Sequence, residues 1–308
     1  RSFSRSSPPH KEPGLKLAVI GMGLMGGSAA LAMKRAGTIH SVYACDMSPE
    51  AVSDSISMGI ADEGGSDPAE AARSADVIMV ATPVMTMESI FRQIAPVMKP
   101  DAVVTDIGSV RGMVQEGARR ALGAKFSQYA PCHPIAGGEK PGVRYAFADM
   151  FVGKKVISTA EEGMSARAVE IIESLWKSCG AQIIRMSPER HDEVFALMSH
   201  LPHVLAYALV AMITESRDPD TLLSMGGTGF LDFSRIAASS PVMWRDICLA
   251  NRKAISEGLR RYRAELELFQ KAIDDGNADQ LVAGFARAAQ ARRKLGQGDS
   301  LKTQVKKP

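Results

Sequence analysis

The first 187 residues of the chain alternate short apolar segments with segments of helical length and pattern. Near-continuous apolar runs lie at residues 16–20, 41–45, 76–81 and 102–106, and helical patterns separate them at 26–35, 49–58, 86–98 and 111–122. Strands that are apolar on both faces and alternate with helices form parallel sheets covered by helices on both sides. With right-handed crossovers, the pattern predicts a doubly wound α/β domain. Further strands are predicted at 128–131, 155–158 and 182–185.

The turn after the first apolar segment reads Gly21-Met22-Gly23-Leu24-Met25-Gly26. Its glycines match GxGxxG between a predicted strand and a predicted helix, which is the context that this motif requires. The first glycine permits a tight turn, the second lets a pyrophosphate approach the backbone, and the third allows close packing of helix on strand. The amides at the helix start then face the phosphates. We therefore predict a Rossmann-type dinucleotide-binding domain whose cofactor residues include Gly21, Gly23, Leu24, Met25 and Gly26.

A carboxylate follows at the end of the second predicted strand. Asp46 stands twenty residues after Gly26, the offset expected for an acidic residue that binds the adenosine ribose hydroxyls. Residues 45–48 include no Arg or Lys to accept a 2′-phosphate, so the sequence favours NAD, although Asp46 does not bar NADP. We assign Thr82 and Pro83, at the end of the third apolar run, to the same cofactor site. FAD uses the same fingerprint, but the chain is short for a flavoprotein. A glycine-rich turn that has lost its cofactor is the structural alternative.

The pattern changes at residue 187. Ser187 is a good helix N-cap and Pro188 a good first helical residue, and no strand candidate follows them. We therefore predict a dinucleotide-binding domain at 15–187 and an all-α domain at 188–295, with disordered tails at 1–14 and 296–308. The Ser-, Arg- and Pro-rich first tail fits a tag remnant, a trimmed native tail or the end of a transit peptide.

Composition excludes several classes of function. The net charge of +3 resides in the two tails, which hold six basic and two acidic residues, so the rest of the chain carries −1 and offers no nucleic-acid-binding face. Four scattered cysteines without a CxxC motif favour a reducing, cytoplasmic location, or a plastid if the first tail comes from a transit peptide. The longest apolar run, 201–213, contains Pro202 and His203 and is shorter than the ~18–20 residues of a membrane span. We expect no membrane segment.

A candidate catalytic base lies near the predicted crevice. His133 stands at the end of a predicted strand and precedes Pro134 and the pair Gly137-Gly138. The carboxyl ends of strands border the ligand crevice of a doubly wound sheet. A base that accepts an alcohol proton near pH 7 is well served by a histidine. We therefore predict that His133 is catalytic.

Segments 106–111, 132–140 and 198–203, with 233–237 and Met243-Trp244, resemble the prephenate/arogenate dehydrogenase family of tyrosine biosynthesis. The resemblance extends from about residue 15 to residue 293. It implies a nucleotide-binding domain followed by a helical domain that forms a homodimer. It also implies that a ring hydroxyl of a cyclohexadienol is oxidised, that hydride passes to the nicotinamide, and that the ring carboxylate leaves as CO2. Restored aromaticity makes this reaction effectively irreversible.

The resemblance also assigns roles to individual side chains. His133 would hold and polarise the C4 hydroxyl, and Ser109 would orient His133. Arg235 would bind a substrate carboxylate, for which planar guanidinium is better suited than Lys, and either of the two carboxylates is a sensible partner. The remaining predicted substrate residues are Ser199 and His203 in the pocket, Glu139 at its mouth, and Trp244, which would reach the neighbouring subunit's site.

Three of these residues also have structural interpretations. Ser109 is a suitable N-cap for a helix that starts near Val110. Arg235 fits an ordinary helix surface, and Trp244 fits a buried interface.

The histidines have structural interpretations too. Pro202 leaves a backbone carbonyl without its usual partner, which His200 or His203 can satisfy. Cys132 and His133 could join these two in a zinc site, but the resemblance implies no metal, and we predict none.

Two other functions compete with this prediction. The β-hydroxyacid dehydrogenases share the domain layout but rely on a Lys with an Asn one turn later, and residues 188–216 contain neither. A non-catalytic ligand sensor on the same fold is the second alternative. The loop at 137–140 presents both Glu139 and Lys140, so for the enzyme we favour dual use of prephenate and arogenate.

Overall fold

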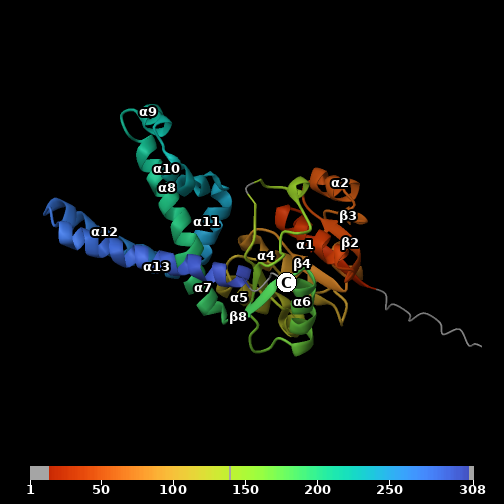
Figure 1. Cartoon of the computed structure of the whole chain (residues 1–308). Helices are drawn as coiled ribbons and strands as arrows, with labels where there is room; N and C mark the ends of the chain where they lie inside the picture. The colour runs from red at the N-terminus through yellow and green to blue at the C-terminus, as the bar shows by residue number, and fades with distance from the viewer. Residues whose placement is uncertain (1–13, 139, 305–308) are drawn as a thin grey trace, which may run out of the picture. The chain divides into compact units, whose positions relative to one another are not determined.

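The computed structural model describes residues 14–138 and 140–304 (Figure 1). The chain divides into two compact units, one that ends at Ala254 and one that begins at Ile255. The first unit contains a parallel sheet with strand order β3-β2-β1-β4-β5. Its strands are β1 (Leu15–Ile20), β2 (Ile39–Cys45), β3 (Glu63–Gly65), β4 (Val77–Val80) and β5 (Val103–Asp106). The predicted doubly wound fold is confirmed. Chain order reverses between β1 and β4, and such a reversal opens a ligand crevice at the carboxyl ends of the strands.

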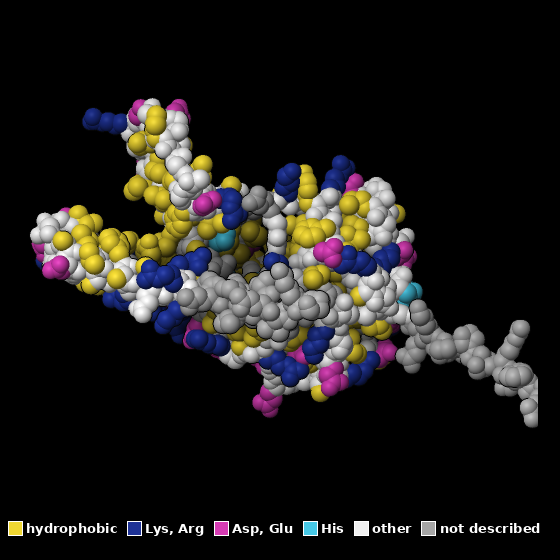
Figure 2. Space-filling view, in the orientation of Figure 1, with side chains coloured by type: hydrophobic (Ala, Val, Ile, Leu, Met, Phe, Trp, Pro, Cys, Tyr) yellow, Lys and Arg dark blue, Asp and Glu magenta, His cyan; other side chains and the backbone are white. Residues whose placement is uncertain are grey.

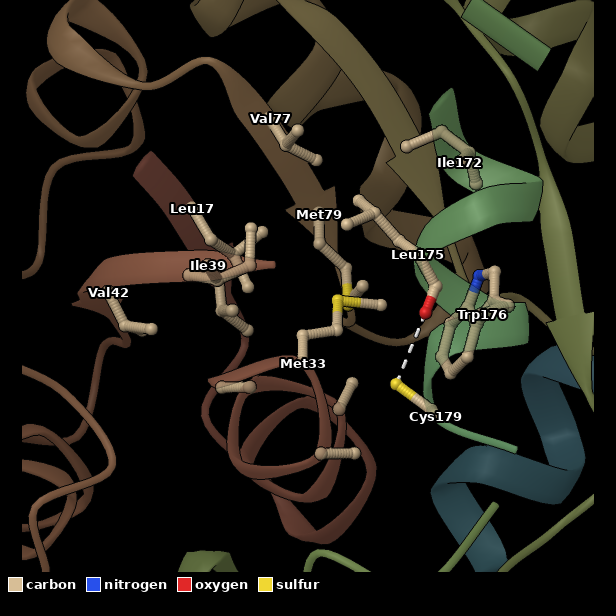
Figure 3. Packing of buried hydrophobic residues seen from close by; sticks show 14 of the residues in the cluster. Leu17, Met33, Ile39, Val42, Val77, Met79, Ile172, Leu175, Trp176 and Cys179 are labelled. Atoms are coloured by element: carbon tan, nitrogen blue, oxygen red, sulfur yellow. Dashed lines mark hydrogen bonds between the residues drawn. The ribbon is translucent and has the colours of Figure 1, made fainter. Parts of the chain in front are cut away.

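Helices cover both faces of this sheet. They are α1 (Leu24–Arg35), α2 (Pro49–Ser57), α3 (Pro68–Ser74), α4 (Met87–Ile94), α5 (Gly112–Leu122) and α6 (Ala166–Ser178). Successive residues of β1 serve opposite faces, since side chains alternate along a strand. Leu17 packs in the core that includes Met79 and Trp176 (Figure 3), whereas Ala18 packs in a second core with Phe91.

A second sheet, of order β6-β7-β8, carries the candidate base. Its strands are β6 (Cys132–Pro134), β7 (Lys155–Ser158) and β8 (Gln182–Arg185). The strands predicted at 155–158 and 182–185 are confirmed. In place of the strand predicted at 128–131, the structure has only an isolated parallel bridge between Tyr129 and Val104 of β5. A 3-10 helix (Gly123–Gln128) comes before this bridge, and His133 lies within β6, opposite Ile157.

All described elements after β8 are helices. In the first unit these are α7 (Pro188–Phe195), a π-helical turn (Ala196–His200), α8 (Leu201–Thr214), α9 (Pro219–Ser224), α10 (Thr228–Ser234), a 3-10 turn (Arg235–Ala238) and α11 (Pro241–Ala250). The Ser187 hydroxyl caps α7 by accepting from the Arg190 amide, as predicted. The long helices α12 (Arg252–Asp274) and α13 (Ala278–Gln304) form the second unit, apart from the first residues of α12.

By length and composition alone, the continuous helix Pro188–Thr214 could cross a membrane: an 18-residue window of it has a mean hydropathy of 1.6, and 22% of that window is buried. A core helix of a soluble protein has the same properties, so this observation is weak evidence for a membrane role.

Candidate active site

Two glycines of the loop at residues 21–26 have no room for a side chain, and the third has open space beside it. Gly21 adopts φ +100°, and a Cβ there would lie 2.7 Å from the Ala81 carbonyl carbon. A Cβ on Gly26 would lie 2.4 Å from the Gly21 carbonyl oxygen, whereas a Cβ on Gly23 would meet no atom within 4 Å. Gly23 is the N-cap of α1, which has no side-chain cap and no acidic residue in its first turn. The α1 amides therefore suit an anion such as a pyrophosphate.

The Asp46 carboxylate lies beside this loop. It accepts hydrogen bonds from the Met22 and Ser48 amides, each at 2.8 Å. Each oxygen keeps a lone pair that can accept from a ribose hydroxyl. Asp46 also lines a cavity of about 560 Å³, and the described residues that line this cavity include no Lys or Arg. This surrounding suits a ribose without a 2′-phosphate.

The other predicted cofactor residues border the same loop. A Cβ on Gly21 would also lie 2.9 Å from the Thr82 amide nitrogen, so Thr82 and Pro83 adjoin the first glycine. Met25 is partly buried against the core. A Cβ on Gly138 would lie 3.1 Å from Leu24 Cδ2, which brings the loop after His133 close to the start of α1.

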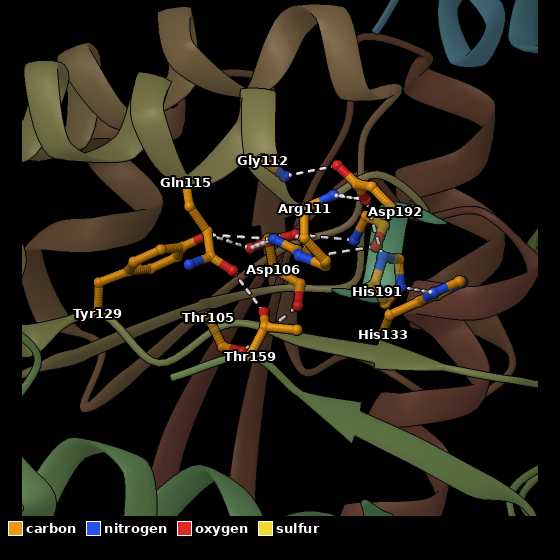
Figure 4. Close-up of polar contacts among 11 residues, drawn as sticks. Thr105, Asp106, Arg111, Gly112, Gln115, Tyr129, His133, Thr159, His191 and Asp192 are labelled. Atoms are coloured by element: carbon orange, nitrogen blue, oxygen red, sulfur yellow. Dashed lines mark hydrogen bonds and ion pairs between the residues drawn. The ribbon is translucent and has the colours of Figure 1, made fainter. Parts of the chain in front are cut away.

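His133 is held by a second histidine. Its Nδ1 lies 2.8 Å from His191 Nε2 (Figure 4). The His133 ring packs edge-on against Phe195, with ring centroids 5.0 Å apart. Burial lowers the pKa of His133 well below its ordinary value, and the electrostatic effects of His191 and of the Arg111 guanidinium lower it further. A neutral imidazole at neutral pH is able to accept a proton.

Sequence reasoning missed the next two members of this cluster. His191 is fully buried, and its Nδ1 lies 2.8 Å from Asp192 Oδ1. The Asp192 carboxylate also accepts from the Arg111 and Gly112 amides, each at 2.8 Å. The only signal in the sequence was a His-Asp pair in the first turns of a helix, with nothing to indicate a partner 58 residues away.

The same contacts explain how α5 begins. The helix starts at Gly112, and Asp192 supplies the acceptor for its first amides. Ser109 therefore does not cap this helix. It lies partly buried in the loop before α5, and no hydrogen bond joins it to His133 among the described residues.

A buried ion pair lies beside the histidines. The side chains of Asp106 and Arg111 are both 0% exposed, and two hydrogen bonds of 2.7 and 2.8 Å join them. Arg111 Nη1 also donates to the Gly108 carbonyl at 2.8 Å. Its positive charge lowers the pKa of both His133 and His191. Arg111 thus favours the neutral form of both rings, whereas the Asp106 charge raises the pKa of His191.

A break in the helical pattern positions His203. Pro202 has no amide hydrogen, and the preceding π-helical turn lets the Leu201 amide bond the Ala196 carbonyl. His203 Nδ1 lies 2.9 Å from the Ser199 carbonyl oxygen, so His203 does bond a nearby carbonyl. Its ring also stacks on Trp244, with centroids 3.7 Å apart.

The other residues predicted to bind substrate, and the nearby His200, have different surroundings in the structure. Arg235 begins the 3-10 turn after α10, and its charge contributes, after burial, to a lowered pKa of His203. Glu139 lies outside the described residues. Trp244 is buried against Val110 and Ile247. His200 is buried, with Nδ1 3.2 Å from Asn251 Nδ2.

Two protein-family models match this chain, and together they cover most of its length. Residues 29–185 match the family model for the prephenate dehydrogenase nucleotide-binding domain, and residues 187–287 match the model for the prephenate dehydrogenase dimerization domain. The chain belongs to the prephenate dehydrogenase family. This finding confirms the family that the sequence motifs predicted.

Relatives within the prephenate dehydrogenase family carry several substrate names. The cyclohexadienyl dehydrogenase of Zymomonas mobilis is 35% identical, over 91% of this chain and 95% of its own. The structure of Aquifex aeolicus prephenate dehydrogenase with hydroxyphenyl propionate and NAD+ has a TM-score of 0.86 and 34% identity, covering 91% and 98% of the two chains. Synechocystis arogenate dehydrogenase has a TM-score of 0.76 and 25% identity, covering 91% and 100%.

No group of three or more His, Cys, Asp or Glu side chains that could hold a metal ion is found in the part of this prephenate dehydrogenase family member that the structure describes.

Proposed function

We propose that the chain catalyses the oxidative decarboxylation of prephenate, arogenate or both, and that His133 is its catalytic base. The observation that carries this proposal is the His133 ring, which is bonded through Nδ1 to buried His191. Its Nε2 is left for a substrate, and the loop that follows it runs to the dinucleotide-binding turn. Family membership supplies the reaction class.

The cofactor of this reaction is NAD. Open space at Gly23, the uncapped amides of α1 and the Asp46 carboxylate would hold its pyrophosphate and ribose. NAD, when bound, supplies the hydride acceptor. The Aquifex aeolicus relative contains NAD+, and the cation-free surroundings of Asp46 support NAD over NADP.

The side chains around the pocket bind the substrate and hold the proton. His133 Nε2 accepts the C4 hydroxyl proton, and Ser109, in the loop before α5, would hydrogen-bond near the same hydroxyl. Arg235 binds a substrate carboxylate as a bidentate partner, and His203, with Ser199 behind it, lines the pocket. Trp244 fixes the His203 ring by stacking.

We propose that both prephenate and arogenate are substrates. The two differ by a keto group in place of an ammonium group, and the 137–140 loop carries one acidic and one basic residue. Relatives with the names cyclohexadienyl, prephenate and arogenate dehydrogenase are 35%, 34% and 25% identical to this chain.

We also propose that the enzyme is a cytoplasmic homodimer formed through its helical domain. The family model for residues 187–287 describes a dimerization domain, and apolar side chains gather over α8 and α9 (Figure 2). Among these, Met212 is 64% and Met225 78% exposed, which is unusual unless a partner covers them. All four cysteines are free, in keeping with a reducing compartment. The transit-peptide alternative falls on residues 1–13, outside the described residues.

The test is NADH formation with each substrate and with NAD or NADP. His133→Asn should lower kcat by about 100-fold or more, the usual contribution of a general base, while the Kd for NAD stays unchanged. His40→Asn, at an exposed position on β2, is the matched control. No NADH from either substrate with the unaltered enzyme would refute the proposal and favour a ligand sensor.

A further inference from the structure

We propose that His191 and Asp192 are positioning residues that hold His133 in the tautomer with its proton on Nδ1, so that Nε2 is free to accept a proton. The inference rests on the proposed function for the role of His133 as the base. The tautomer itself follows from contacts within this chain.

The Asp192 carboxylate anchors the two histidines. It accepts from the Arg111 and Gly112 amides, and both are fixed donors at the start of α5. These bonds and His191 together lower the pKa of Asp192, against the effect of its burial, so the group is ionised at neutral pH. An ionised carboxylate can only accept hydrogen bonds. The contact of 2.8 Å with His191 therefore requires a proton on His191 Nδ1.

His191 lies between Asp192 and His133 and contacts each through one ring nitrogen. Burial lowers the pKa of His191, and the Arg111 charge lowers it further. The hydrogen bond and charge of Asp192 act in the opposite direction, but the pKa of His191 remains below its ordinary value. A neutral imidazole carries one proton, which Asp192 holds on Nδ1. His191 Nε2 is then an acceptor, and the atom 2.8 Å away, His133 Nδ1, must be the donor.

The proton on His133 Nδ1 determines what the other nitrogen of that ring can do. With its single proton on Nδ1, neutral His133 has a bare Nε2, which is the atom that a general base needs. In the opposite tautomer an N–H would face the substrate hydroxyl, and two unprotonated nitrogens would face each other between the rings. The groups that face His133 electrostatically are His191, Arg111 and His200, and none of them is an anion that would favour a second proton.

Arg111 acts at both ends of this arrangement. Its amide holds Asp192 at 2.8 Å, and its buried guanidinium keeps a positive charge near both rings. The start of α5 thus fixes the position of the proton on the His133 ring, which lies in the second sheet. It acts through the side chains of Asp192 and His191.

The first measurement is the 15N NMR spectrum of histidine-labelled protein, which distinguishes protonated from bare imidazole nitrogens. The chain has six histidines, and single substitutions assign them. We expect His133 and His191 both to carry their proton on Nδ1 in the substrate-free enzyme. A proton on Nε2 of His133 would overturn the inference.

The second measurement compares His191→Leu with His191→Gln. The Gln side chain can place its amide oxygen near the position of His191 Nε2 and accept from His133, whereas Leu cannot. We expect Leu to lower kcat by about 100-fold and to move the His133 proton towards Nε2. Gln should stay within about tenfold of the unaltered enzyme, with KM and the Kd for NAD unchanged in both.

Equal kcat values for the two folded variants would contradict a positioning role, and His40→Leu serves as the control for loss of an exposed histidine. If the Leu variant does not fold, the spectra of the unaltered enzyme and of the Gln variant decide. The proposed function fails separately: an enzyme without turnover but with the expected proton positions would refute the reaction and leave the tautomer inference standing.

Discussion

Substitutions at two glycines of the same loop should separate cofactor binding from folding. Gly23→Ala places a methyl group where no atom lies within 4 Å, on a backbone with φ −91° that alanine tolerates. Its cost to folding is limited to the poorer N-cap, below about 1 kcal/mol. Because the methyl group occupies the space that a pyrophosphate would approach, we expect the Kd for NAD to rise at least about tenfold, equivalent to ~1.4 kcal/mol.

Gly26→Ala is the matched variant with the opposite expectation. Its Cβ would lie 2.4 Å from the Gly21 carbonyl oxygen and 2.9 Å from Val19 Cγ1, so backbone must move. Overpacking of this kind costs about 1–3 kcal/mol, and each kcal/mol lowers Tm by about 2–4 °C for a unit of this size. Calorimetric Tm values and NAD titration of both variants provide the test. A Gly23→Ala enzyme that binds NAD as tightly as the unaltered one would refute our placement of the pyrophosphate.

Three further results are expected. Arg111→Met leaves Asp106 buried without its partner and should cost about 3–5 kcal/mol in urea unfolding; a loss below about 1 kcal/mol would contradict the importance of the pair. Since the pKa of His133 lies below its ordinary 6.5, kcat/KM should stay level as pH falls through 6.5, and a midpoint at or above 6.5 would argue against this base. Burial lowers the pKa of His200 to about 4. Between pH 6.5 and 4 this histidine is therefore protonated in the unfolded chain and neutral in the folded chain. Stability should then fall by about 3 kcal/mol between pH 6.5 and 4, and His200→Gln should show a smaller fall; an identical pH dependence would exclude His200 as its source.

The parts of the fold that could be predicted are those with a local cause. The apolar runs indicate which strands are buried on both faces, and the glycine spacing indicates where the chain turns tightly. Both features depend on residues that are close together in the sequence. The short edge strand β3 was not predicted, because Glu63–Gly65 has no apolar pattern and is a strand only through its backbone pairing with β2.

The parts that could not be predicted depend on contacts between distant segments. Ser109 was a reasonable N-cap for α5 by its distance from the helix, but Asp192, 80 residues from Gly112, supplies that acceptor. His191 carried no distinctive pattern, since its importance comes from one contact with His133. His133 was conspicuous because Pro134 and the pair Gly137-Gly138 follow it in the sequence.

The cap that Asp192 places on α5 limits how this enzyme can move. The carboxylate joins the first helix after β8 to a helix on the main sheet, and the Asp192 carbonyl accepts from Asn251 at 2.8 Å near the end of the first unit. A hinge opening at residue 187 would strip two amide donors from a charged group and separate His191 from its anchor. These bonds therefore favour motions in which α7 and the start of α5 move together.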